Sequence, residues 1–199
     1  MKKFFTATAL VITLIVLLAW PYMAVGQKSV QLSELNMNFK LPGNALLLTR
    51  EADRSGLPLD MYKLLKRTDI DAEFKKADIY MQAKYQDFEI QVDAFADFGT
   101  AFLFDLDKLT KEQLQEVLLS FAEMYQGDKV SLYKPAGTTY ILVEYRDKKL
   151  GDSYTTHSYM TIKNGRLINI ALICPDKQST ATRTDKLKRV VDSITYIKK

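Results

Sequence analysis

The second half of the chain contains four largely apolar stretches that are rich in β-branched and aromatic residues. Asn164-Gly165, between the last two stretches, is a strong signal for a two-residue hairpin turn. The last stretch is apolar on both faces, which is typical of an inner strand that is covered on both sides. The pattern therefore predicts an antiparallel meander. Its predicted strands are residues 130–134, 138–146, 154–163 and 166–174.

The first half of the chain predicts shorter strands. Residues 37–41 alternate, and Pro42-Gly43-Asn44 predicts a turn before a second apolar stretch at 45–49. Residues 79–84 and 88–93 predict a hairpin. Within 88–93 the alternation is strict, so we expect one apolar face and one solvent-facing side.

Helical spacing of apolar residues is clearest between Thr110 and Tyr125. Thr110 and Gln113 form a capping-box pattern at its start, and Gly127 is expected to end the helix. A second stripe, over 187–194, predicts a C-terminal helix that is followed by a short tail. Two shorter helices are expected near residues 61–65 and 70–77.

These elements predict an α+β fold, in which an antiparallel β-sheet is flanked by helices as an α/β/α sandwich. Their order resembles the PsbP-like family: Leu41-Pro42-Gly43 ends an early strand, a helix lies mid-chain, and Val191-Asp192-Ser193-Ile194 closes the last helix. The resemblance implies an antiparallel sheet flanked by helices. It also implies an accessory or interaction module more readily than an enzyme. The family has no catalytic signature, so the resemblance assigns no functional residue.

The N-terminus has the three parts of a secretory signal peptide. Lys2 and Lys3 precede an uncharged, largely apolar stretch that ends in small residues, and cleavage is expected between Gly26 and Gln27. The alternative is an uncleaved membrane anchor formed by residues 4–25. Either form places the protein outside the cytoplasm, secreted or held at the membrane by this segment alone. We expect a signal peptide or anchor at 1–26, a polar leader at 27–37 and a single domain at 38–199.

Composition excludes several classes of protein. Of the 199 residues, 47% are hydrophobic and 26% are charged, which indicates a globular chain and not a disordered one. The formal net charge of +4 is too small to indicate nucleic-acid binding. Cys174 is the single cysteine, so the chain forms no internal disulfide. We expect this thiol to be a small buried residue of the core.

The sequence contains no recognisable metal or cofactor motif. Asp105-Leu106-Asp107 begins like a calcium loop, but Leu109 and Thr110 occupy positions that need a ligand and a glycine. The two aspartates are better interpreted as an acidic entry to the following helix, where they favour the positive end of the helix dipole. His157 is the single histidine, and no nucleophile elbow is present. We therefore expect no cofactor, no metal site and no catalytic residue; the alternative for a metal is a calcium site built from carboxylates alone.

Aromatic residues are the best candidates for binding. Four phenylalanines occur in a stretch with no clear period, and aromatic residues of this kind often mark a contact surface. Tyrosines also crowd the predicted sheet, and tyrosine suits binding because it combines contact area with a polar tip. Packing in the core and at its rim is nevertheless the simpler interpretation of these residues, which are Tyr133, Tyr140, Tyr145, Tyr154 and Tyr159. The candidate binding residues are Phe95, Phe98, Phe102, Phe104, Tyr140 and Tyr159.

The sequence thus favours an exported, non-enzymatic accessory or binding domain that contacts another protein or a component of the cell envelope. One alternative is a carboxylate-based hydrolase that uses Glu89 and Asp93, which lie four residues apart on one face of a predicted strand. Another is a carrier that holds a small apolar ligand in a cavity lined by the tyrosines.

Overall fold

The structure is a computed structural model that covers most of the predicted domain. Residues 1–26, which carry the predicted export segment, and the helix predicted near 61–65 lie outside the described residues. Side chains are not described for residues 145–147 and 154–156. The described residues are 27–43, 45–50, 72, 74–95, 104–125, 129–147, 154–174 and 181–197.

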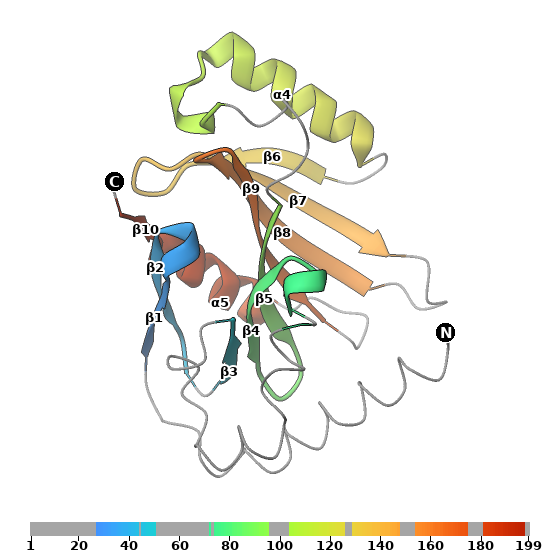
Figure 1. Cartoon of the computed structure of the whole chain (residues 1–199). Helices are drawn as coiled ribbons and strands as arrows, with labels where there is room; N and C mark the ends of the chain where they lie inside the picture. The colour runs from blue at the N-terminus through green and yellow to red at the C-terminus, as the bar shows by residue number, and fades with distance from the viewer. Residues whose placement is uncertain are drawn as a thin grey trace.

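An antiparallel sheet of seven strands, in the order β3-β4-β5-β9-β8-β7-β6, forms the centre of the molecule (Figure 1). The hairpin predicted for residues 79–93 and the predicted meander are both present. Asn164 and Gly165 have φ of 53° and 71°, the positive values that a type I′ hairpin turn requires. The strands are β3 (Leu46–Thr49), β4 (Ile79–Lys84), β5 (Glu89–Phe95), β6 (Lys129–Tyr133), β7 (Tyr140–Asp147), β8 (Tyr154–Lys163) and β9 (Arg166–Ile173).

Strand β9 lies in the interior of this sheet, between β5 and β8, as its apolar sequence predicts. Ile168, Ile170 and Leu172 on one of its faces are almost fully buried. Because the backbone of β9 is hydrogen-bonded on both sides, we expect its amides to exchange with solvent only through global unfolding. Native-state hydrogen exchange measures this directly. Exchange at Ile170 as fast as at the exposed Lys129 of the edge strand β6 would rule out the inner position.

A second, three-stranded antiparallel sheet has the order β1-β2-β10. Its strands are β1 (Lys28–Leu32), β2 (Met37–Leu41) and β10 (Thr195–Tyr196), and the short helix η2 (Ser33–Leu35) joins the first two. Residues 27–37, predicted to be a polar leader, therefore belong to the domain. Strand β1 alternates: Val30 and Leu32 point into the core, while Ser29 and Gln31 face solvent.

Two longer helices cover opposite faces of the seven-stranded sheet (Figure 1). Helix α4 (Lys111–Met124) begins with the predicted capping box, in which Thr110 and Gln113 each accept a hydrogen bond from the other's backbone. Its buried Phe121 packs on one face of the sheet, over β7 and β8. Helix α5 (Ala181–Asp192) packs on the other face together with the small sheet, through Leu187, Val190 and Val191.

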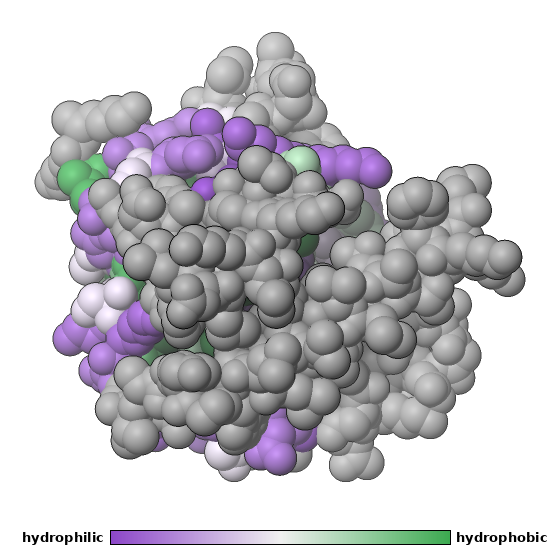
Figure 2. Space-filling view, turned by 60° about the horizontal axis from the view of Figure 1, so that its bottom comes forward, coloured by the Kyte–Doolittle hydropathy of each residue, from purple (hydrophilic) through white to green (hydrophobic). Residues whose placement is uncertain are grey.

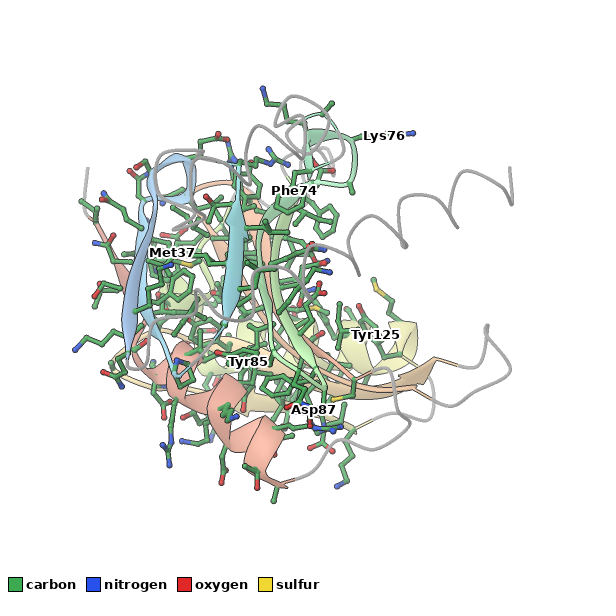
Figure 3. All side chains as sticks on the ribbon, turned by 90° about the horizontal axis from the view of Figure 1, so that it is seen from below. Met37, Phe74, Lys76, Tyr85, Asp87 and Tyr125 are labelled. Atoms are coloured by element: carbon green, nitrogen blue, oxygen red, sulfur yellow. The ribbon has the colours of Figure 1, made fainter. Side chains whose placement is uncertain are left out.

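The β4–β5 turn is attached to α5. Asp87 accepts hydrogen bonds from Arg183 Nη2 at 2.6 Å and from its Nε at 3.1 Å. Tyr85 stacks on Phe88 with ring centroids 4.3 Å apart, and the ammonium group of Lys186 lies 5.3 Å from the Tyr85 ring. Tyr85 and Asp87 lie beside α5 when the molecule is seen from below (Figure 3). Two cations of α5, Arg183 and Lys186, thus have partners within the domain.

The fold is α+β with antiparallel sheets and helices on both faces of the larger one, as the sequence predicts. Cys174, at the end of β9, is fully buried, as expected for a small core residue. No helix in the described part of the chain is long and apolar enough to span a membrane. On the side of the molecule shown in Figure 2, the described surface is mostly hydrophilic.

Candidate binding site

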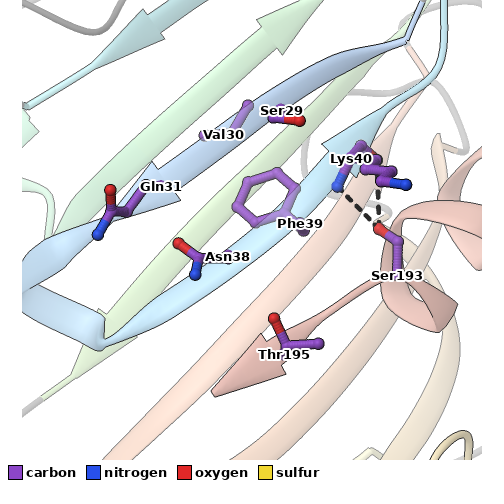
Figure 4. A pocket seen from close by; sticks show the side chains of 8 residues that line it. All are labelled: Ser29, Val30, Gln31, Asn38, Phe39, Lys40, Ser193 and Thr195. Carbon is purple, nitrogen blue, oxygen red and sulfur yellow. Dashed lines mark hydrogen bonds between the residues drawn. The ribbon is translucent and has the colours of Figure 1, made fainter. Parts of the chain in front are cut away.

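The outward face of the three-stranded sheet is hollowed into an open groove of about 820 Å³. Strands β1, β2 and β10 present their solvent-facing side chains there side by side (Figure 4). The groove is assembled from the two ends of the described chain, because β2 pairs with β10 between Asn38 and Thr195. The lining residues that reach solvent are Ser29, Gln31, Asn38, Lys40, Ser193 and Thr195; Val30 and Phe39 also line the groove, although their side chains are buried.

Ser193, just after α5, fixes one side of the groove. The backbone N–H of Lys40 donates a hydrogen bond to Ser193 Oγ at 2.8 Å. Ser193 Oγ lies 2.7 Å from the carbonyl oxygen of Val190 and 3.4 Å from that of Lys40. Both polar backbone groups of Lys40 are therefore directed toward the end of α5, which locks β2 to the helix (Figure 4).

The groove is polar and basic. Ser29, Gln31 and Lys40 are exposed, and Asn38 is half-buried. At the start of β1, burial lowers the pKa of Lys28, although this lysine keeps part of its surface in solvent. Among the described residues that line the groove, Lys40 carries a charge and none is acidic. The site therefore has hydrogen-bonding side chains and a positive charge to offer a ligand.

A second groove, of about 650 Å³, lies at the other side of β10 and reaches the short helix η5 (Leu106–Lys108). Its carboxylates are already engaged. Asp105 accepts a hydrogen bond from the backbone N–H of Asn164 at 2.9 Å, and Asp107 binds Lys163 and the backbone N–H of Thr139. The two aspartates, interpreted from sequence as charges at the entry to a helix, thus tie the segment before α4 to the large sheet.

The predicted aromatic contact surface does not appear as a single exposed patch in the described residues. Phe95 is half-buried at the end of β5, and the half-buried Phe104 packs beside the core cluster under α4. Phe98 and Phe102 lie outside the described residues. Neither Phe95 nor Phe104 lines the described grooves.

Tyr140 and Tyr159, the other two candidate binding residues, belong to the core. Tyr140 is fully buried, and its ring meets that of Tyr159 edge-on with centroids 6.4 Å apart. Tyr133 meets Tyr159 in the same way at 5.3 Å. Tyr140 and Tyr159 are therefore unavailable at the surface, because their rings fill the space between the sheet and α5. A sequence pattern does not distinguish a tyrosine in the core from one at the rim of the core.

The two carboxylates of the hydrolase alternative also differ from expectation. Glu89 forms an ion pair with Lys84 at 2.9 Å. Asp93, predicted on a solvent-facing side, is only 8% exposed. It accepts hydrogen bonds from Gln91 Nε2 at 2.7 Å and Asn169 Nδ2 at 3.2 Å. Burial raises the pKa of Asp93 to about 6, although the two amide hydrogen bonds oppose the shift.

His157 lies on β8 opposite Glu144 of β7, and it is half-buried. Burial lowers the pKa of its imidazole, so the neutral form is favoured at pH 7. In the described part of the chain, no three His, Cys, Asp or Glu side chains are grouped so that they could hold a metal ion.

The polar groove is therefore the candidate site, although the sequence analysis did not identify it. The alternation of Ser29 and Gln31 with apolar residues was the available signal.

Comparisons with known proteins concern the fold alone. No family model matches the chain, and the search of curated proteins finds no match either. The structure is similar to the solution structure of cyanobacterial PsbP (CyanoP) from Synechocystis sp. PCC 6803, with a TM-score of 0.49 and 13% sequence identity. The match covers 87% of this chain and 94% of that chain.

Proposed function

We propose that this protein is an exported accessory or binding domain that acts outside the cytoplasm through contact with another protein or a component of the cell envelope. The observation that supports this function is the open polar groove over the small sheet. It presents exposed hydrogen-bonding side chains on a framework that is fixed by β-pairing and by Ser193. A rigid, open and polar surface of this kind suits recognition of a macromolecular segment.

Export is part of the same proposal. The tripartite pattern of residues 1–26 directs the chain across a membrane, with cleavage between Gly26 and Gln27. Gln27 and β1 directly follow that junction. The groove would therefore be close to the membrane if the segment stayed attached as an anchor, and it would be free if the segment were removed.

The described contacts give the alternatives less support. A glycosidase pair needs two carboxylates that face a substrate, whereas Glu89 is neutralised by Lys84 and Asp93 is held by two amides within the sheet. A carrier needs an apolar cavity lined by the tyrosines. Tyr133, Tyr140 and Tyr159 instead pack against one another.

Site-specific crosslinking in the native envelope tests the proposed function. A photoreactive residue at position 31 samples the groove, and one at position 98 samples the predicted aromatic loop. A third, at the exposed Glu116 on the outer side of α4, is the matched control. We expect a discrete adduct from position 31, absent from position 116, that excess unlabelled protein removes. Absence of a competable adduct at both 31 and 98 would contradict the binding function, whereas an adduct from 98 alone would place the contact on the loop.

A further inference from the structure

Strand β1 forms an edge of the small sheet. It pairs with β2 on one side, and among the strands that the structure describes none pairs with its other side. The five residues of β1 make this a longer edge than the two-residue β10 at the opposite side of the same sheet. An open strand edge is a template for pairing with another extended segment.

The contacts of Lys40 show which groups of β1 point outward. Lys40 directs its N–H to Ser193, away from β1, and it is the register partner of Ser29. In an antiparallel ladder, a pair whose backbone groups point away from each other alternates with a pair that exchanges hydrogen bonds. Ser29 and Gln31 therefore direct their N–H and C=O groups to the open edge, while Val30 between them is bonded to Phe39 of β2.

The charge beside this edge indicates what kind of strand fits it. The exposed Lys40 lies across from Ser29, and Lys28 begins β1. The described residues that line the groove include no carboxylate that could neutralise Lys40. A second copy of this chain, added through its own β1, would bring the same lysines to the junction, and β1 itself contains no acidic residue. A strand with acidic side chains would instead complement the site.

We propose that the protein binds an extended, acidic segment of a partner polypeptide, which adds to β1 as a fourth strand of the small sheet. The inference rests on the proposed binding function and names the partner's chemistry. The N–H and C=O groups of Ser29 and Gln31 pair with the incoming backbone, and acidic side chains of the segment lie over Lys40. Backbone pairing provides affinity in this mode, and the side chains beside it provide selectivity.

A synthetic peptide in which valine alternates with glutamate is the probe, and its matched partner carries lysine in place of glutamate. We expect the full-length protein to bind the glutamate peptide about ten-fold more tightly than the lysine peptide, with a difference that salt reduces. NMR-detected hydrogen exchange should show new protection of the Ser29 and Gln31 amides. The Val30 amide, already bonded to β2, should change little. Equal affinity for both peptides, or no protection at Ser29 and Gln31, would overturn the proposal.

Gln31→Pro removes the outward N–H and leaves the bonds between β1 and β2 in place, because proline is tolerated on the open side of an edge strand. Gln31→Thr keeps the N–H and is the matched control. Peptide affinity should fall about ten-fold in the proline variant, the loss expected for an edge hydrogen bond and the added ring, and persist in the threonine variant. Unchanged thermal unfolding shows that the fold is retained. If Gln31→Pro keeps full peptide affinity, strand addition is wrong, while a competable native adduct from the photoreactive residue at position 31 would still support the binding function.

Discussion

Asp93→Asn should stabilise the protein by about 1–3 kcal/mol at pH 7.5 and leave it almost unchanged at pH 3, the difference that a pKa shift of this size implies. The pKa of Asp93 rises from an ordinary value of 3.8 to about 6 because the carboxyl group is buried. The folded protein thus holds this proton more tightly than the unfolded chain does. The contribution of Asp93 to stability is present below about pH 4 and is lost as the pH rises through 6. Asparagine removes that loss.

The amides around Asp93 can accommodate the substitution. Gln82 donates to Gln91, Gln91 donates to Asp93, and Asn169 donates to Asp93 from the other side. Asn169 Oδ1 is buried and has no hydrogen-bond partner. An asparagine at position 93 can accept from Gln91 and, once the Asn169 amide turns over, donate its own N–H to Asn169 Oδ1, and protonated Asp93 can do the same. Both states satisfy an acceptor that the carboxylate leaves without a donor.

Urea unfolding of the wild type and the variant, at both pH values, measures the effect. The difference between the two proteins isolates Asp93 from other titrating groups. Glu89→Gln is the control, because Glu89 lies on the same strand face but is paired with Lys84. The Glu89→Gln variant should be no more stable than the wild type at pH 7.5. A destabilised Asp93→Asn variant at pH 7.5 would show that the charged carboxylate stabilises the sheet.

Asp93 also shows what a strand pattern leaves open. Strict alternation from Phe88 to Asp93 correctly places Asp93 and Gln91 on one face of β5, opposite Ile90 and Val92. Alternation says which residues share a face, but burial depends on the neighbouring strands and on whatever packs above them. Strand β5 is the third of seven strands, and this inner place in the sheet removes Asp93 from solvent. The local sequence around Asp93 does not show where β5 lies in the sheet.

Local signals in the sequence were sufficient for much of the fold. The Asn164-Gly165 turn, the capping box at Thr110 and the apolar β9 each determine structure within a few residues, and all three are confirmed. Pairing between distant segments was not predictable in the same way. β2 and β3 are neighbours in sequence but belong to different sheets, and β2 pairs instead with β10 at the other end of the chain.

The same limit explains why the candidate groove was missed. It forms only when β2 is placed between β1 and β10 and when Ser193 reaches Lys40. The groove residues are common polar types with no motif among them. The aromatic residues that seemed better candidates follow a general tendency of contact surfaces. Aromatic side chains also fill protein cores, and Tyr140 and Tyr159 are buried in the core instead of forming a contact surface.

Asp107→Ala should destabilise the protein by about 2–4 kcal/mol, the range expected when one partner of a partly buried, hydrogen-bonded charge pair is removed. The Asp107 carboxylate binds the Lys163 ammonium group and the N–H of Thr139. The side chains of Asp107 and Lys163 are 20% and 18% exposed, so solvent screens the pair only in part. The variant would leave the Lys163 charge without this partner and would remove one of the two aspartate contacts that tie the segment before α4 to the large sheet.

The size of the loss decides between two roles for Asp107. A carboxylate that merely favours the helix dipole contributes about 0.3–1 kcal/mol. Glu112, exposed in the first turn of α4, is a matched control for that role, and Glu112→Gln should cost no more than this. A double-mutant cycle of Asp107→Asn with Lys163→Met, followed by urea unfolding, should give a coupling energy above about 1 kcal/mol. If Asp107→Ala proves as mild as Glu112→Gln, the dipole interpretation of the sequence is right and the tie to the sheet contributes little.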